Sequence, residues 1–129
     1  MNTGEYRWRI PVGRSEAMDA IRKLGIHDQL GLPFRSWALV TKTVMIVVQM
    51  GYYDAPHSEP GFNIPIMELH NFDPHLWVYN KANGEMLAEI ALPANATGAP
   101  ITYLAGGKQY IAFPVGGGTI AEELIAVSF

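Results

Sequence analysis

The sequence predicts an all-β fold built from repeated antiparallel four-stranded units. Short runs rich in β-branched and aromatic residues follow one another along the 129 residues, and 13 glycines and 9 prolines separate them. Asn83-Gly84 and Gly106-Gly107 stand between such runs, where a β-hairpin needs its turn. The stretches "NTGEYRWRIP" and "NGEMLAEIALP" both pass from a turn through Gly-Glu to Ile and Pro, which indicates an internal repeat.

Seven strands are expected in two consecutive sets. In the first set, strands A to D are Ser36–Thr41, Thr43–Met50, Leu76–Asn80 and Glu85–Leu92. In the second set, strands A to C are Pro100–Leu104, Lys108–Val115 and Glu123–Ser128. Thr43–Met50 is almost continuously apolar, which predicts a strand covered on both faces. Glu5–Ile10 follows a Thr-Gly turn and is expected to be strand D of a preceding set.

One stretch, Ser15–Gly25, is expected to be helical. Ser15 is suited to cap the N-terminus, acidic residues come early, basic residues come late, and Gly25 is suited to end the helix. Residues 25–35 and 51–74 are expected to be irregular. The second of these is long for a loop in a compact domain, and loops of that length are usually functional.

A repeated antiparallel four-strand unit with a glycine turn before its last strand is typical of a β-propeller blade. On this basis, residues 1–12 end a preceding blade, residues 36–93 form one full blade with a long loop over 51–74, and residues 98–129 give three strands of a final blade. Stacked repeats bury their faces only against neighbouring repeats, so at least about three repeats are needed for stability. We therefore expect the chain to be a segment of a larger ring.

Composition and charge exclude several other classes of protein. The net charge is −3 and the basic residues form no cluster, so a nucleic-acid interface is not expected. The chain has no cysteine, which excludes disulfides, thiolate metal sites and a cysteine nucleophile. The first residues lack the apolar core of a secretory signal, and the longest apolar run, Val44–Val48, is too short to span a bilayer.

These stretches resemble the C-terminal end of the pyrroloquinoline-quinone (PQQ)-dependent dehydrogenases. The blades of that family carry a tryptophan-docking motif, in which a Trp follows a Thr-Gly turn by four positions. Thr3-Gly4 and Trp8 match its second half. A second, altered copy consists of Val78, Asn80, Asn83, Gly84 and Ala88. Its last position holds Ala in place of the Trp that buries an aromatic face between blades.

The stretches "LGLPFRSWALVTKT", "LPANATGAPITY" and "GGKQYIAFPVGGG" resemble the same family. The resemblance implies a fragment of an eight-bladed β-propeller, with about two incomplete blades. It also implies a periplasmic enzyme that oxidises alcohols or sugars with PQQ and Ca²⁺. The family's metal ligands and catalytic base lie in earlier blades, and no position here matches them. No catalytic or metal-binding residue is therefore assigned, and the segment alone is expected to be inactive and to bind no cofactor tightly.

The same resemblance implies two cofactor-lining segments. Arg35, Ser36 and Trp37 match a family segment that approaches the quinone, and Gly116, Gly117 and Gly118 match a glycine-rich loop that closes the last blade. Glycines in such a loop let the backbone approach a planar ligand. The alternative is structural: a tight loop and a tryptophan that packs between blades.

Two rival interpretations remain open. Histidines and carboxylates in the long loop have the chemistry of a Zn²⁺ site, although their spacing fits no known motif. These residues are His57, His70, His75, Asp54, Glu59, Glu68 and Asp73. Alternatively, the chain is a non-catalytic β module that binds a partner. For a dehydrogenase segment and for a β module alike, the expected partners are the remaining blades or a second copy. They would be contacted through exposed strand edges at Glu5–Ile10 and Glu123–Ser128.

Overall fold

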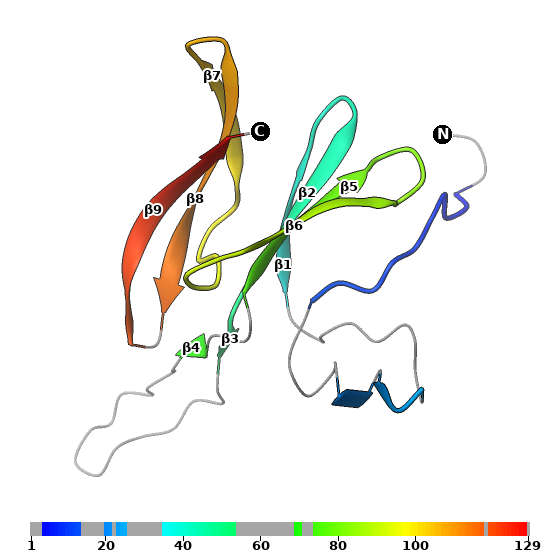
Figure 1. Cartoon of the computed structure of the whole chain (residues 1–129), viewed down its shortest axis with the longest axis horizontal. Coiled ribbons are helices and arrows are strands. Elements are labelled where there is room, and N and C mark those ends of the chain that lie inside the picture. The colour runs from blue at the N-terminus through cyan, green and yellow to red at the C-terminus, as the bar shows by residue number, and fades with distance from the viewer. Residues whose placement is uncertain are drawn as a thin grey trace.

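The computed structural model describes residues 4–13, 20–21, 23–25, 35–53, 69–70, 74–117 and 119–128. These residues form an all-β structure with two main antiparallel sheets, as predicted (Figure 1). The strands are β1 (Ser36–Val40), β2 (Val44–Gln49), β3 (Tyr52–Tyr53), β4 (Leu69–His70), β5 (His75–Asn80), β6 (Met86–Ala91), β7 (Ile101–Ala105), β8 (Lys108–Gly117) and β9 (Ile120–Ser128). No helix within the described residues is long and apolar enough to cross a membrane.

The first sheet has four strands in the order β1-β2-β5-β6, with every neighbouring pair antiparallel. All four strands lie within a residue or two of their predicted positions. The turn between β5 and β6 is tight: Asn80 N donates to Glu85 O at 2.8 Å, and Gly84 N donates to Asn80 O at 2.9 Å. Gly84 has φ +76°, a conformation that favours glycine, so the Asn-Gly signal correctly predicted this turn.

The second sheet has three strands in the order β7-β8-β9. Its first turn is formed by Gly106 and Gly107, with φ values of +56° and +77°. Strand β9 begins at Ile120, three residues before the predicted Glu123, and β8 runs two residues beyond its predicted end. The extension arises from a register shift between Val115 and Gly117, which lets the two strands stay paired to the end of β8.

One short link joins the two sheets. Ala96 forms a parallel bridge with Met50 at the end of β2 and an antiparallel bridge with Val115 in β8. Ala96 N donates to Gln49 O at 2.9 Å, and Gly116 N donates to Asn95 O at 3.0 Å. The link is buried, because Asn95 and Ala96 are both 0% exposed. The ends of β2 and β8 are therefore held next to each other.

The main core lies between the two sheets. The contributing residues from β2 and β5 are Ile46, Val48, Leu76 and Val78, and those from β8 are Ile111, Phe113 and Val115. In each strand these positions alternate, so one face of each sheet is turned toward the other sheet. Burial of this apolar area is the main stabilising term of the fold.

A smaller core lies on the other face of the first sheet. Val47, Trp77 and Tyr79 point to that side, and Ile10 and Val12 of the N-terminal segment pack against them. The first sheet is thus covered on both faces, as predicted for its second strand. In Figure 1 the three layers follow one another as the β7–β9 sheet, the β1–β6 sheet and the N-terminal segment.

The predicted strand over Glu5–Ile10 is not paired within the described residues, and its assignment to a preceding blade stays a prediction. Residues 4–13 are extended but belong to no sheet, because no strand within the described residues lies beside them to complete a backbone ladder. The segment is held instead by side-chain contacts of Trp8, Ile10 and Val12.

The predicted helix Ser15–Gly25 falls mostly outside the described residues. Within it, residues 20, 21 and 23 are helical, Leu24 N donates to Ile21 O at 3.1 Å, and Gly25 has φ +68°. The predicted long loop over 51–74 also lies largely outside the described residues. Its two ends pair as β3 and β4, through Tyr52 with His70 and Tyr53 with Leu69.

Candidate functional site

Arg35 lies at the start of β1, beside the end of β2. Met50 N donates to Arg35 O at 3.1 Å, and Ser36 pairs with Gln49 in the sheet register. Since Met50 also bridges to Ala96, the start of β1 is connected through two backbone contacts to the link between the sheets. Arg35 is exposed at this position.

Gly116 reaches the same end of the molecule from the other sheet. Its N–H donates to Asn95 O, next to Ala96. Arg35 and Gly116, which are 81 positions apart by their numbers, therefore belong to one continuous set of backbone contacts through Met50 and Ala96. Figure 1 shows this end of the sheets opposite to the three hairpin turns β1–β2, β5–β6 and β7–β8. The structure thus brings two of the sequence-predicted segments to a common end.

The glycines at this end do not form the free loop that the sequence suggested. Gly116 and Gly117 are the last residues of β8, and Gly118 lies outside the described residues. A Cβ atom at Gly116 would stand 2.9 Å from Glu122 Cα, so the absence of a side chain lets β9 approach closely. This packing gives Gly116 a structural reason to be glycine. Gly117, with φ +103°, adopts a backbone conformation that L-residues rarely reach.

Ser36 and Trp37 point to opposite faces of the first sheet. Trp37 pairs with Val48, whose side chain belongs to the core between the sheets, whereas Ser36 pairs with Gln49. Trp37 is 37% exposed, so its indole remains reachable from outside. Of the two side chains, only Trp37 is on the face that is turned toward the second sheet.

A polar cluster on the other face of the first sheet was missed by sequence reasoning. Trp77 Nε1 donates to Glu89 Oε1 at 2.9 Å, and His75 Nε2 lies 4.0 Å from the same oxygen. The rings of His75 and Trp77 stack with centroids 5.8 Å apart. Burial raises the pKa of Tyr79 above 10.0, and the Glu89 carboxylate raises it further. The signal that could have found this cluster is the cross-strand register, in which Trp77 faces Glu89.

The assignment of His75 to a loop metal site is wrong in its position. His75 is the first residue of β5, is 8% exposed and contacts Trp77 and Glu89. His57 and the loop carboxylates lie outside the described residues, and of His70 only the strand pairing is known. Among the residues that the structure describes, no three His, Asp or Glu side chains gather in a way that could hold a metal ion.

The N-terminal segment is fixed on the β5–β6 turn by Trp8. Trp8 Nε1 donates to Lys81 O at 3.0 Å. The ring also covers Gly84, where a Cβ atom would stand 2.8 Å from Trp8 Cδ2. Ala88, four positions after Gly84, lies in β6 and packs against the core between the sheets. The turn glycines of the β7–β8 hairpin, Gly106 and Gly107, have no atom within 4 Å of a built Cβ.

The side chains at the end of the sheets where Arg35 and Gly116 lie fit part of a PQQ site. PQQ is a planar aromatic anion, and Arg35 offers a guanidinium for a carboxylate while Trp37 offers an aromatic surface. Ca²⁺ is usually held by several oxygen ligands with carboxylates among them, and the described residues hold no group of three His, Asp or Glu side chains placed to bind a metal ion. Among the described residues, this end therefore offers groups for one side of a quinone and no ready-made set of metal-binding side chains.

Comparisons with known proteins agree with the predicted family. A family model described as PQQ, glucose/ethanol/alcohol dehydrogenase β-propeller domain matches residues 1–111. Quinoprotein glucose dehydrogenase of Escherichia coli (strain K12) is 44% identical over 45 residues, which are 35% of this chain and 6% of that protein. The match thus spans a small part of the relative's length. No solved structure matches this chain.

Proposed function

Since the chain belongs to the β-propeller family of the PQQ-dependent glucose, ethanol and alcohol dehydrogenases, we propose that it supplies neighbouring blades to a quinoprotein ring. The four-stranded β1–β6 sheet would be one complete blade and the β7–β9 sheet the first three strands of the next. The assembled protein would oxidise an alcohol or a sugar in the periplasm. PQQ, when bound, supplies the electron acceptor for that oxidation.

One observation carries this proposal. The link through Ala96 brings the start of β1 and the end of β8 to the same end of two sheets that pack face to face. In this arrangement Arg35, Ser36 and Trp37 would contribute a cation, a hydroxyl and an aromatic surface to the cofactor wall. Gly116 and Gly117, with Gly118 beyond them, would contribute backbone.

We expect the isolated chain to be catalytically inactive. Of the parts that the reaction requires, this chain would provide a positioning wall and would lack both the metal ligands and a base. In the presence of PQQ, Ca²⁺ and either glucose or ethanol, the 129-residue chain should not reduce a redox dye. Dye reduction above the rate of free PQQ would contradict this expectation.

The cofactor-lining role is tested in a hybrid enzyme. The segment of the E. coli quinoprotein glucose dehydrogenase that matches this chain would be replaced by the corresponding residues of this chain, with residues 35–37 included. Arg35→Ala in the hybrid should weaken PQQ binding by about tenfold, the value of one charge-assisted contact. Arg9 is an exposed arginine of the N-terminal segment, and Arg9→Ala is the matched control in a hybrid that includes this segment. Equal PQQ affinity of the hybrid with and without Arg35 would contradict the assignment.

A second candidate function is a non-catalytic β module. The outward face of the β7–β9 sheet favours it, because this face carries exposed apolar side chains, including Ile101 at 61% and Leu124 at 76% exposure. Strand β9 is an edge strand of its sheet. A partner, either further blades or a second copy, would cover these groups. Leu124→Lys should then lower the sedimentation coefficient of the chain at high concentration, and an unchanged monomer at all concentrations would contradict self-association.

A further inference from the structure

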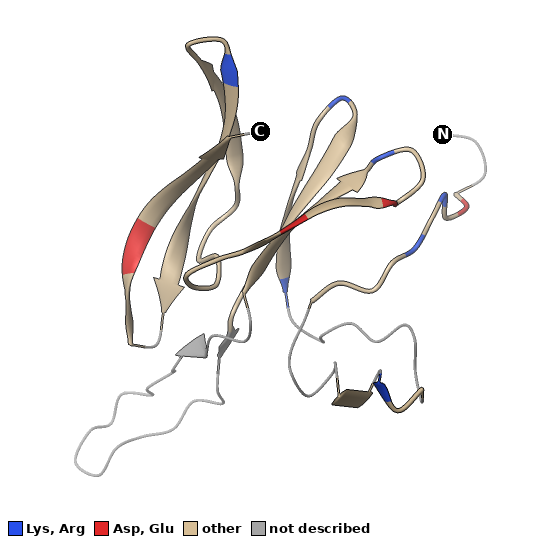
Figure 2. Ribbon diagram, viewed as in Figure 1, with Lys and Arg blue, Asp and Glu red and all other residues tan. Residues whose placement is uncertain are grey.

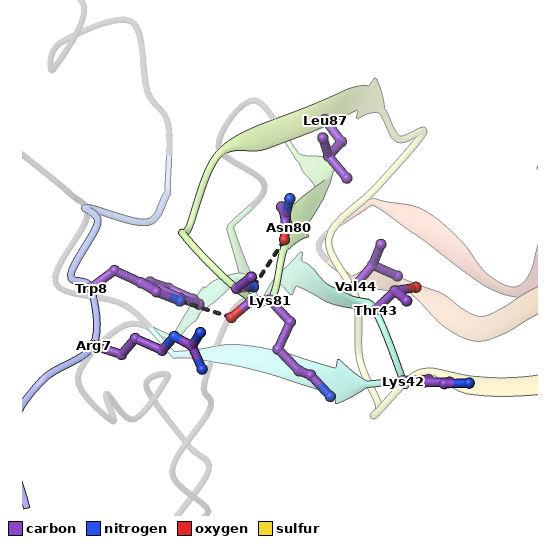
Figure 3. A pocket seen from close by; sticks show the side chains of 9 residues that line it. Arg7, Trp8, Lys42, Thr43, Val44, Asn80, Lys81 and Leu87 are labelled. Atoms are coloured by element: carbon purple, nitrogen blue, oxygen red, sulfur yellow. Dashed lines mark hydrogen bonds between the residues drawn. The ribbon is translucent and has the colours of Figure 1, made fainter.

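An open groove lies at the end of the first sheet where its hairpins turn. It has a volume of about 890 Å³, within the range of pockets that hold small ligands. The residues that line it are Arg7, Trp8, Lys42, Thr43, Val44, Asn80, Lys81, Ala82 and Leu87. They come from three separate parts of the chain: the N-terminal segment, the β1–β2 turn and the β5–β6 hairpin (Figure 3).

The lining of this groove is positively charged, although the chain as a whole is negative. It includes Arg7, Lys42 and Lys81 and no acidic residue. Lys81 Nζ donates to Thr41 O at 2.8 Å, a neutral acceptor that positions the ammonium group without cancelling its charge. Within the part of the chain that the structure describes, no carboxylate forms an ion pair with any of these three cations. In Figure 2 the hairpin turns of both sheets carry basic residues, another basic residue stands at the opposite end of the first sheet, and an acidic residue lies beside the β5–β6 turn.

The rest of the lining is mainly apolar. Trp8, Val44 and Leu87 contribute carbon surface, and in Figure 3 Leu87 stands across the groove from the three cationic side chains. Leu87 is 53% exposed, so its side chain is available to a ligand. The Trp8 ring cannot move freely, because its Nε1 donates a hydrogen bond to Lys81 O and its face lies on Gly84. One wall of the groove is therefore formed before any ligand arrives.

This groove is separate from the candidate cofactor end. Lys42 and Thr43 stand in the turn after β1, whereas Arg35 stands before it, so the two sites lie at opposite ends of the same strand. The register agrees, since Val44 pairs with Asn80 at the groove and Ser36 pairs with Gln49 at the other end. A ligand in the groove would not occupy the place of the quinone.

We propose that this groove binds a small amphiphilic anion, with a carboxylate or phosphate head group on an apolar body. The head group would be held by Arg7 and Lys42, with Lys81 adding positive charge from its fixed position. The apolar body would cover Leu87, Val44 and the open side of the Trp8 ring. This inference does not depend on the proposed function, because it uses neither the quinone nor the other blades.

The test is a titration of the full chain followed through the Trp8 indole N–H resonance, with calorimetry in parallel. Octanoate and hexyl phosphate represent the two head groups, octanamide is the neutral counterpart of octanoate, and inorganic phosphate is the anion without an apolar body. Octanoate, hexyl phosphate or both should bind saturably with a Kd below about 1 mM. Octanamide and inorganic phosphate should each bind at least about tenfold more weakly.

Three variants identify the groups responsible. Arg7→Gln and Lys42→Gln should each weaken binding by about threefold to tenfold, and Leu87→Ser should weaken it by about tenfold. Lys108→Gln is the matched control, because this exposed lysine follows the β7–β8 turn and does not line the groove. Lys81 is left unchanged, since its contact with Thr41 joins the two hairpins.

The possible results separate clearly. Binding that depends on the head-group charge, on Leu87 and on Arg7 or Lys42 supports the proposal, and the better head group names the ligand class. Equal binding of octanoate and octanamide would overturn it, because charge would then play no part. An equal effect of Lys108→Gln and Lys42→Gln would also overturn it, since the attraction would be non-specific. Absence of saturable binding by either amphiphilic anion would do the same.

Discussion

The indole ring of Trp8 lies against the backbone of Gly84, so closely that a Cβ atom at Gly84 would stand 2.8 Å from Trp8 Cδ2. Two independent requirements thus meet at Gly84. The β5–β6 turn needs its φ of +76°, and Trp8 needs its missing side chain. The contact is reinforced by the hydrogen bond from Trp8 Nε1 to Lys81 O. It joins the N-terminal segment to the hairpin of the first sheet.

Gly84→Ala should destabilise the protein by two effects. Alanine at positive φ costs about 1–2 kcal/mol, and displacement of the Trp8 ring adds about 1–3 kcal/mol to the loss in free energy of unfolding. Urea unfolding measures the sum. The matched control is Gly106→Ala, which shares the turn conformation at φ +56° and has no atom within 4 Å of the new Cβ. Equal losses for the two variants would mean that the Trp8 contact contributes nothing.

Trp8→Phe separates the hydrogen bond from the ring contact. Phenylalanine keeps an aromatic face for Gly84 and loses the indole N–H, so the free energy of unfolding should fall by about 0.5–1.5 kcal/mol. Trp8→Ala removes both and should cost more. The two variants are compared by urea unfolding. A larger loss for Trp8→Phe than for Trp8→Ala would contradict this division.

Stability should fall in alkaline solution because of Tyr79. Burial raises the pKa of Tyr79 above 10.0 in the folded state, and the nearby Glu89 carboxylate adds to the shift. Above pH 10.0 the unfolded chain therefore loses this proton while the folded chain retains it, so the free energy of unfolding decreases as pH rises toward the folded pKa. Below pH 10.0 the stabilising effect is fully present.

The measurement is urea unfolding at several values between about pH 8 and about pH 11. Tyr79→Phe should have a smaller loss of stability across this range than the original chain, since lysines and the other tyrosines titrate equally in both. Glu89→Gln should lower the pKa of Tyr79, which can be followed by the ultraviolet absorbance of tyrosinate. Identical slopes for the original chain and Tyr79→Phe would contradict the raised pKa.

The core between the sheets should dominate stability. Phe113 of β8 is 1% exposed and belongs to the same core cluster as residues of β2 and β5. Phe113→Ala should therefore lower the free energy of unfolding by about 3–5 kcal/mol. Because that loss could unfold a small protein completely, Phe113→Leu is the milder variant and should cost less than about 1.5 kcal/mol. Leu124→Ala on the exposed face should change stability by less than about 0.5 kcal/mol. Urea unfolding with equal effects at Phe113 and Leu124 would contradict the assignment of the core.

Hydrogen exchange should reveal the link between the sheets. The amides of Ala96 and Gly116 donate to Gln49 O and Asn95 O, and both residues are buried. They should exchange about as slowly as the amides of β2 and β8, although Ala96 stands outside any regular strand. Heteronuclear NMR after transfer to D₂O measures this. Rapid exchange at Ala96 would show that the link opens independently of the sheets.

Most of the two main sheets could be predicted from the sequence because their signals are local. Runs rich in β-branched and aromatic residues located the strands, and Asn83-Gly84 and Gly106-Gly107 located two turns within a residue. The expected strand over Glu5–Ile10 depends on a non-local requirement. A strand exists only when a partner completes its ladder, and the described residues contain none for this segment.

The candidate sites were predictable to a smaller extent. Arg35 and Gly116 were chosen by family resemblance, and their common position depends on Ala96, which the sequence presents only within the stretch "LPANATGAPITY". The His75–Glu89 pairing depends on strand register. The groove of Arg7, Lys42 and Lys81 depends on Trp8 reaching a turn more than seventy positions away, and no local pattern predicts such an approach.

The second sheet differs from the first in having bare turn glycines. No atom comes within 4 Å of a Cβ built at Gly106 or Gly107, whereas the Trp8 ring covers Gly84 in the first sheet. Heating should therefore fray the tip of the β7–β8 hairpin first, while the β5–β6 tip remains closed beneath Trp8. Of these two hairpins, the one whose turn has an aromatic cover should open last.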